Sequence, residues 1–101
     1  MISTDLEARS LETRARVFAA LSDPIRLRIL DLLTFGSSCV CDLQEAVEVA
    51  PNLLSYHLRV LREAGLVETS RRGRWIDYSL VPEVIDSLAQ ALPAPSPRVR
   101  V

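Results

Sequence analysis

The stretch that most limits the fold is residues 51–80, where one amphipathic helix leads directly into two strand-like segments. Pro51 suits the first turn of a helix, and Gly65 suits the position just past its end. The inner face of this helix is a stripe of leucines at helical spacing: Leu54, Leu58 and Leu61. Two strand-like runs and the arginine-rich loop between them follow in the order 66–69, 70–74 and 75–80. A helix followed at once by a β-hairpin predicts an α+β domain.

Apolar spacing, capping residues and helix stops predict four further helices, at residues 4–21, 24–34, 40–47 and 82–92. The helices at 40–47 and 51–64 are joined by a very short turn, and the second has a polar outer face, which suggests a helix-turn-helix. Together with the hairpin behind it, this unit predicts a mainly α fold with a β-hairpin wing (α+β). The expected architecture is a winged helix-turn-helix in the order ααααββα.

The chain of 101 residues is the size of one small domain, which we predict over residues 1–92. Alternating prolines over 93–101 hold neither a helix nor a central strand, so this segment is predicted to be a disordered tail. No apolar run approaches the ~20 residues of a membrane span, and the first residues lack the basic and apolar regions of a secretory signal. We therefore expect a cytoplasmic protein without a membrane partner.

The net charge of −1 is an average over segments of opposite sign. Residues 1–50 carry five arginines and eight acids, for a net of −3, whereas residues 51–80 carry five arginines and three acids, for a net of +2. All 12 basic residues are arginine, whose guanidinium suits forked contacts to phosphate. The basic charge is therefore concentrated in the helix-and-hairpin segment.

The predicted partner of this segment is double-stranded DNA. An exposed helix fits the major groove, and a basic hairpin reaches phosphates or the minor groove. The expected DNA contacts lie on the outer face of helix 51–64 and in the wing loop: Pro51, Asn52, Ser55, Tyr56, Arg59, Arg71, Arg72 and Arg74. The alternative is that the three loop arginines only form a solvated surface.

The first and last helices are more apolar than a chain of this length can hide within itself. A homodimer through them would place two reading helices about one DNA turn apart. The expected interface residues are Leu11, Phe18, Leu21, Val84, Ile85 and Leu88. The competing interpretation is that both helices pack on the core of their own chain.

Two cysteines, Cys39 and Cys41, are separated by a single residue. A disulfide across that spacing would be strained, and cytosolic thiols stay reduced, so the pair indicates metal binding or redox chemistry. Side chains two apart on an α-helix point about 200° away from each other, so one ion takes both sulfurs only where the first turn is non-helical or unwinds. The alternative is that both cysteines are small apolar fillers.

The ordered motifs of residues 10–92 resemble the ArsR/SmtB family. The segments that carry the resemblance are Asp23–Leu30 (DPIRLRIL), Cys39–Leu43 (CVCDL), Leu54–Val67 (LSYHLRVLREAGLV) and Arg72–Leu80 (RGRWIDYSL). The resemblance implies a dimeric winged-helix repressor that leaves an inverted-repeat operator when it binds a metal or metalloid.

The resemblance also implies that Cys39 and Cys41 bind a thiophilic inducer such as arsenite, cadmium or lead. Capture of the ion would distort helix 40–47 and move helix 51–64 off its groove. Arsenite regulators of this pattern often carry a third cysteine where this chain has Gln44, so the identity of the ion is left open. Within the same fold, nickel or zinc, or oxidation of the thiols, remain alternative signals.

Two other classes of protein compete with a DNA-binding repressor. An enzyme is excluded by inventory, because the chain has one histidine, three glycines and no Ser/His/Asp set or phosphate loop. A module that binds protein rather than DNA remains an alternative. The single histidine, His57, is interpreted as structural or close to DNA, and Trp75 as a packing residue that anchors the hairpin.

Overall fold

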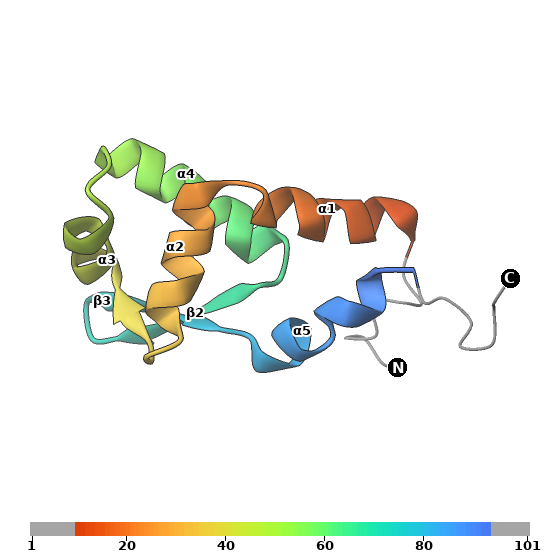
Figure 1. Ribbon diagram of the computed structural model, residues 1–101. Helices are drawn as coiled ribbons and strands as arrows, with labels where there is room; N and C mark the ends of the chain where they lie inside the picture. The colour runs from red at the N-terminus through yellow and green to blue at the C-terminus, as the bar shows by residue number, and fades with distance from the viewer. Residues whose placement is uncertain (1–9, 94–101) are drawn as a thin grey trace, which may run out of the picture.

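The computed structural model describes residues 10–93 (Figure 1). The elements are α1 (Leu11–Leu21), α2 (Pro24–Leu33), β1 (Ser38–Cys39), α3 (Val40–Val47), α4 (Pro51–Glu63), β2 (Val67–Arg72), β3 (Trp75–Leu80), α5 (Pro82–Asp86) and the 3-10 helix η2 (Leu88–Ala91). The mainly α fold with a β-hairpin wing is confirmed. The first turns of the helix expected over 4–21, and the tail expected over 93–101 apart from its first residue, lie outside the described residues.

Two local predictions are wrong, and one short strand is missing from the prediction. The two-residue strand β1 was not expected, and the loop expected over 70–74 shrinks to a two-residue turn because β2 continues to Arg72. The helix expected over 82–92 is interrupted at Ser87, whose backbone leaves the helical region and whose hydroxyl donates to the carbonyl oxygen of Glu83. A serine that bonds to the preceding turn competes with helix continuation, which explains the break.

The three strands form one antiparallel sheet in the order β1-β3-β2. The turn between β2 and β3 consists of Gly73 and Arg74, and Gly73 has a φ of 63°. A glycine with positive φ at the first position of a two-residue turn matches the twist of the flanking strands. At the other edge, Cys39 of β1 lies opposite Asp77 of β3. The sheet therefore ties the cysteine segment directly to the wing.

The core lies between α2, α4 and the sheet. The predicted leucine stripe of α4 is confirmed, because Leu54, Leu58 and Leu61 are all buried. The buried residues of α2 that join them are Ile29, Leu30 and Leu33. Burial of one face of α4 leaves its opposite face in solvent, where a partner has access to it.

A buried arginine joins three helices. Arg26 of α2 is 9% exposed, and its guanidinium donates to the carbonyl oxygens of Ala20 at 2.7 Å and Ala19 at 3.2 Å. Its third contact is His57 of α4, whose Nδ1 lies 2.9 Å from Nη1. Because a guanidinium only donates, this nitrogen of the imidazole is the acceptor. The contact, with His57 only 4% exposed, supports the structural interpretation of the histidine.

Asp23 caps the start of α2. Its Oδ1 accepts from the backbone N–H groups of Ile25 at 2.8 Å and Arg26 at 3.3 Å, and Pro24 occupies the first helical position. Partial burial acts to raise the pKa of Asp23, but the two N–H bonds outweigh it and hold the pKa below its ordinary value of 3.8. The charged carboxylate is therefore the form that the folded chain prefers.

We expect Asp23→Ala to lower the free energy of unfolding by about 1 kcal/mol at neutral pH, because two N–H groups lose their acceptor. Since folding lowers the pKa, the contribution of the charge is fully present above pH 3.8 and is lost as the pH falls through the lower folded-state value. Urea unfolding of both proteins at several pH values checks this. Asp23→Asn, which keeps the acceptor, is the control and should stay within a few tenths of a kcal/mol at neutral pH. If the difference in the free energy of unfolding between the wild type and Asp23→Ala does not narrow in acid, the assignment of the Asp23 carboxylate as the cap of α2 is contradicted.

Candidate DNA-binding surface and thiol site

The outer face of α4 presents the residues expected to contact DNA. Five of them are exposed: Pro51, Asn52, Ser55, Tyr56 and Arg59. The guanidinium carbon of Arg59 lies 5.7 Å from the centre of the Tyr56 ring, a cation–π contact that holds both side chains on this face. Sequence reasoning missed Leu53, which is also exposed here and offers an apolar group suited to a thymine methyl.

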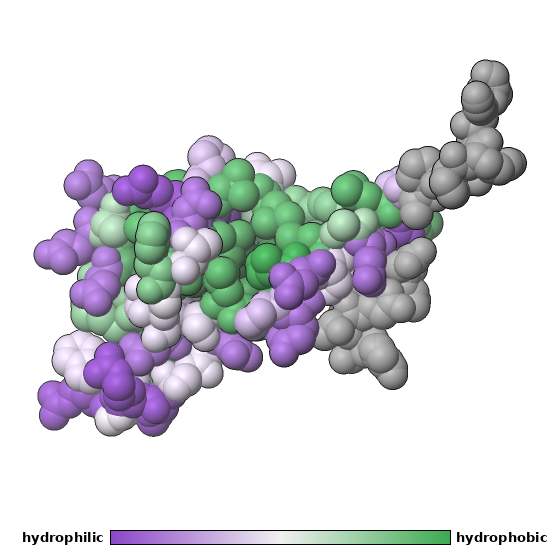
Figure 2. All heavy atoms as spheres, turned by 60° about the horizontal axis from the view of Figure 1, so that its bottom comes forward, coloured by the Kyte–Doolittle hydropathy of each residue, from purple (hydrophilic) through white to green (hydrophobic). Residues whose placement is uncertain are grey.

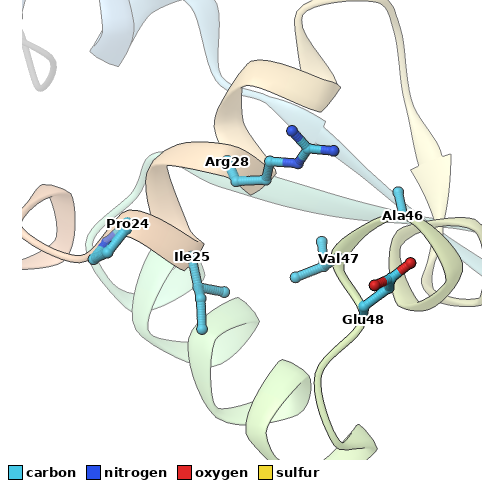
Figure 3. Close-up of a pocket in the computed structure, with 6 residues that line it drawn as sticks. All are labelled: Pro24, Ile25, Arg28, Ala46, Val47 and Glu48. Atoms are coloured by element: carbon cyan, nitrogen blue, oxygen red, sulfur yellow. The ribbon is translucent and has the colours of Figure 1, made fainter.

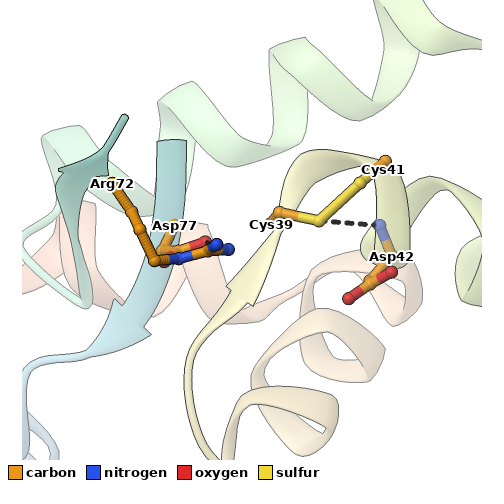
Figure 4. Close-up of polar contacts among 5 residues, drawn as sticks. All are labelled: Cys39, Cys41, Asp42, Arg72 and Asp77. Carbon is orange, nitrogen blue, oxygen red and sulfur yellow. Dashed lines mark hydrogen bonds and ion pairs between the residues drawn. A yellow bond between two sulfur atoms is a disulfide. The ribbon is translucent and has the colours of Figure 1, made fainter. Parts of the chain in front are cut away.

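The three wing arginines have different surroundings. Arg71 and Arg74 are exposed at the tip of the hairpin. Arg72 instead forms a bidentate ion pair with Asp77 across the hairpin, with Nε 2.8 Å from Oδ2 and Nη2 3.1 Å from Oδ1 (Figure 4). The hydrogen bond from Arg72 holds the pKa of Asp77 below its ordinary 3.8, and the same bond raises the pKa of Arg72. Arg71 and Arg74 are therefore the freer cations for a nucleic-acid partner.

The carboxyl of Asp77 should titrate below 3.8 in the folded protein, because Arg72 stabilises its charged form. Replacing Arg72 with alanine should move that pKa upward, since the hydrogen bond is lost and the partial burial of Asp77 remains. Carbon-detected NMR titration of the aspartate carboxyl measures both values. Arg71→Ala is the matched control and should leave the pKa of Asp77 in place. An unchanged value in Arg72→Ala would show that the ion pair is not formed in solution.

The two cysteines meet at the start of α3. Cys39 ends β1 with extended backbone (φ −77°, ψ 164°) and caps α3, and its sulfur accepts from the backbone N–H of Asp42 at 3.4 Å. Cys41 lies in the first turn, and the structure joins the two sulfurs as a disulfide with 5.4 Å between the Cα atoms (Figure 4). The expectation that no disulfide forms is wrong in this structure. The physical reason is that Cys39 is extended rather than helical, which turns the two side chains toward each other.

A carboxylate completes a possible donor set. One ligand atom from each of Cys39, Cys41 and Asp42 lies within 4.8 Å of the others. Once the pair is reduced, this corner offers two thiolates and one oxygen, a set that fits a thiophilic ion better than a hard cation. Gln44, which stands where a third thiol would extend the set, donates its side-chain amide to the carbonyl oxygen of Val49 instead.

An open pocket of about 380 Å³ adjoins the cysteines. It is lined by Cys39, Val40, Cys41, Arg74, Trp75 and Ile76. Trp75 is 48% exposed, so the prediction that it is a packing residue of the hairpin is wrong in its main point. The pairing of β1 with β3 brings the two segments of this pocket together, which sequence spacing alone does not reveal.

A second open pocket, of about 400 Å³, lies between α2 and α3 (Figure 3). Its lining consists of Pro24, Ile25 and Arg28 from one helix, and of Ala46, Val47 and Glu48 from the end of the other. None of these residues was expected to form a site, and the pocket has no thiol or histidine in its lining.

The residues expected at a dimer interface are partly covered by their own chain. Leu11 is 72% exposed on α1. The other five, Phe18, Leu21, Val84, Ile85 and Leu88, are partly buried and pack against the core. Figure 2, in which the α5 side is turned forward, shows apolar side chains gathered across the middle of this face, with hydrophilic ones at the end that carries α3 and the wing. Within residues 10–93 no helix is long and apolar enough to cross a membrane.

Comparison with known proteins places this arrangement in a family. The family model described as bacterial regulatory protein, arsR family, matches residues 23–69. The arsenical resistance operon repressor of Bacillus subtilis (strain 168) is 43% identical over 72 residues, which cover 70% of this chain and 69% of the relative. A cadmium resistance transcriptional regulatory protein CadC homolog from Staphylococcus aureus is 34% identical over 87 residues, which cover 85% of this chain and 72% of that protein.

A solved structure supports the same assignment. The homodimeric winged helix-turn-helix DNA-binding domain from Mycobacterium bovis superposes with a TM-score of 0.71 at 35% identity, over 78% of this chain and 74% of that one. The matched segment contains α2, α3 and α4, which are the helices that form the helix-turn-helix and its support. The family and these relatives are transcriptional regulators rather than enzymes. The chain belongs to the ArsR family of bacterial transcriptional regulators.

Proposed function

We propose that this chain is a cytoplasmic, homodimeric repressor that binds an inverted-repeat DNA operator through α4 and the wing. It releases the operator when a thiophilic metal or metalloid, arsenite or cadmium or lead, binds Cys39 and Cys41. The observation that carries the proposal is the meeting of the two sulfurs at the N-terminus of α3, directly before the helix that faces DNA.

The DNA-binding part is supported by charge and exposure. The exposed polar face of α4 presents an amide, a hydroxyl, a phenol and a guanidinium, which are groups that hydrogen-bond to base edges and phosphates. Arg71 and Arg74 extend this surface to the wing tip, where they reach the phosphate backbone. One such surface makes few contacts, so specific affinity requires two of them in a dimer.

Dimerisation is supported by apolar surface at the end of the molecule formed by α1, α5 and η2. Leu11 and Leu92 are both exposed there, although each is a large apolar side chain. The guanidinium of Arg14 donates to the carbonyl oxygen of Ala91 at 3.1 Å, which fastens α1 to η2 and makes one continuous surface. The similar structure from Mycobacterium bovis is described as homodimeric.

The inducer assignment follows from ligand chemistry and from the relatives. Soft ions prefer thiolates, and a thiol at the N-terminus of a helix ionises more easily. The relatives reported above are regulators of arsenical and cadmium resistance. Reducing conditions in the cytoplasm supply the dithiol form that such an ion needs.

Binding of an ion reaches the DNA surface by two short paths. The sulfur of Cys39 leaves the N–H of Asp42 when it turns to the ion, so the first turn of α3 loses its cap. Cys39 also lies opposite Asp77, which holds Arg72 of the wing. A shift of Cys39 therefore moves both α3, which supports α4, and the β-hairpin.

The test is operator release by reduced protein in the absence of oxygen. A duplex selected from a random pool serves as the operator, and fluorescence anisotropy follows binding while arsenite, cadmium or lead is added. We expect the ion to release the duplex from the wild-type protein. Cys39→Ser and Cys41→Ser should bind the duplex as tightly as the wild type and should stay bound when the ion is added. Ser38→Ala, beside the pair, is the matched control and should release as the wild type does. Normal release by both cysteine variants would overturn the assignment of the inducer site.

The disulfide favours a second signal for the same repressor, which is oxidation of the cysteine pair. In that case an oxidant that forms the disulfide releases the duplex without any metal, and a thiol reductant restores binding. Anaerobic titration with ions, set beside metal-free titration with a disulfide-forming oxidant, separates the two signals because each condition contains only one of them.

A further inference from the structure

We infer that Arg59 of α4 reads a guanine in each half of the operator, and that Tyr56 is the positioning residue that holds its guanidinium for this contact. The inference rests on the DNA-binding part of the proposed function, and it names the base that this surface selects. Three observations carry it: the free donors of Arg59, the contact of its guanidinium with the Tyr56 ring, and the anchoring of that ring to the core.

The guanidinium of Arg59 is exposed and free to bind a base. Over residues 10–93 it makes neither an ion pair nor a side-chain hydrogen bond, whereas the guanidinium of Arg72 in the wing is held by Asp77. Guanine presents two acceptors, N7 and O6, at its major-groove edge, and the forked donors of an arginine match them. Because α4 enters the major groove under the proposed function, guanine is the base that Arg59 fits best.

The ring of Tyr56 limits where this guanidinium goes. The guanidinium carbon of Arg59 lies 5.7 Å from the ring centre, and residues three apart on a helix share one face. The cation–π attraction acts between the positive charge and the face of the ring, so it leaves the N–H donors unpaired. An arginine that is already ordered loses less side-chain entropy when it binds, and this strengthens its contact with a base.

The Tyr56 ring is in turn anchored to the core. It lies edge-on to the ring of His57, with 5.2 Å between the ring centres and 61° between their planes. His57 is 4% exposed, and its Nδ1 lies 2.9 Å from the guanidinium of the buried Arg26, which also donates to carbonyl oxygens at the end of α1. A continuous line of contacts therefore runs from the end of α1 to Arg59, and it orders Arg59 before DNA binds.

The test replaces the guanines of the operator, one at a time, by 7-deazaguanine, which lacks the N7 acceptor and still pairs with cytosine. The duplex is selected from a random pool with the wild-type full chain, and each replacement is made in one half only. Fluorescence anisotropy with reduced protein, without any metal or oxidant, gives the affinity of each protein for each duplex. A contact between Arg59 and one guanine is the position at which the replacement weakens the wild type but not Arg59→Ala.

At that position we expect the replacement to weaken binding by the wild type about 10-fold, and binding by Arg59→Ala less than about twofold. Arg62→Ala is the matched control, because it removes another exposed arginine from α4 and leaves the contact between Tyr56 and Arg59 intact. It should keep the loss of about 10-fold. Tyr56→Phe retains the ring and should also keep this loss, whereas Tyr56→Ala should reduce it to about threefold.

Three results would overturn the inference while the DNA-binding function stands. The first is an operator without a guanine in its halves, or one whose guanines are all insensitive to the replacement. The second is an Arg59→Ala protein that binds every duplex more weakly but keeps the losses of the wild type, because Arg59 then contacts phosphate. The third is a Tyr56→Phe protein as insensitive as Tyr56→Ala, because the hydroxyl rather than the ring then matters.

A wild-type protein that binds no duplex from the pool contradicts the proposed function itself, and the inference falls with it. Circular dichroism and thermal unfolding confirm that each variant is folded before its affinities are compared.

Discussion

Arg26→Ala is expected to lower the free energy of unfolding by roughly 3 kcal/mol, the largest loss that we expect from a single substitution in the described core. The guanidinium satisfies the carbonyl oxygens of Ala19 and Ala20 at the end of α1 and the Nδ1 of His57 in α4. Alanine removes the side-chain donor of the Ala20 oxygen and of His57 Nδ1 and opens a cavity among three helices. The Ala19 oxygen loses one donor and keeps its hydrogen bonds from the N–H and hydroxyl of Ser22. The positive charge also faces the negative end of the α1 dipole, which adds to the loss. Urea unfolding followed by circular dichroism measures the change.

Two companion variants separate hydrogen bonding from packing. Arg26→Met keeps most of the apolar stem and removes the donors, so it should retain most of the loss if hydrogen bonds dominate. His57→Ala removes one acceptor and one ring, and its effect should not add to that of Arg26→Ala because the two side chains share a contact. A loss below about 1 kcal/mol in Arg26→Ala would show that water replaces the guanidinium at little cost.

The second large effect is expected in DNA affinity. Replacing Arg71 and Arg74 together removes four cations from the proposed dimer, so the slope of log K against log salt should become shallower by about 3 to 4. Affinity at physiological salt should fall by about 100-fold or more, because both arginines are exposed at the wing tip and Arg71 has only a long contact of 3.4 Å to the carbonyl oxygen of Gly73. Anisotropy titrations at several salt concentrations measure both quantities.

Two single variants serve as comparisons for this result. Arg72→Ala should weaken binding less per residue removed, because this guanidinium is already committed to Asp77. Arg16→Ala removes an exposed arginine from α1, which lies at the opposite end of the molecule from the wing, and should leave the salt slope unchanged (Figure 1). Equal effects of the wing pair and of Arg16→Ala would show only a general influence of net charge.

The helices were predictable wherever one face is buried in the core and the opposite face is exposed to solvent. Leu54, Leu58 and Leu61 repeat at helical spacing because the core lies on one side of α4, and that pattern survives in the sequence. Arg26 was missed for the converse reason. Arginine usually lies at the surface, and two of its three partners here are backbone carbonyls, which leave no trace in the residue types around them.

The cysteine corner was only half predictable. Spacing showed that the two sulfurs would need a non-helical turn to meet, and the extended backbone at Cys39 provides one. The strand that places this turn, β1, has two residues, which is too short for an alternating pattern to be read. The position of Trp75 beside the pair depends on the pairing of β1 with β3, a contact between distant segments that composition does not encode.

The double role of Cys39, as the cap of α3 and as one of the two sulfurs, would link the sensitivity of the proposed sensor to the stability of α3. The sulfur is available to an inducer only to the extent that α3 tolerates losing its first hydrogen bond. Under the proposed function, residues along α3 therefore set the inducer concentration at which half the molecules respond. An exposed position such as Ala46, changed to glycine, weakens the helix by roughly 1 kcal/mol, about a fivefold change in that concentration. Such a repressor can be retuned to a new threshold while its donor atoms stay the same.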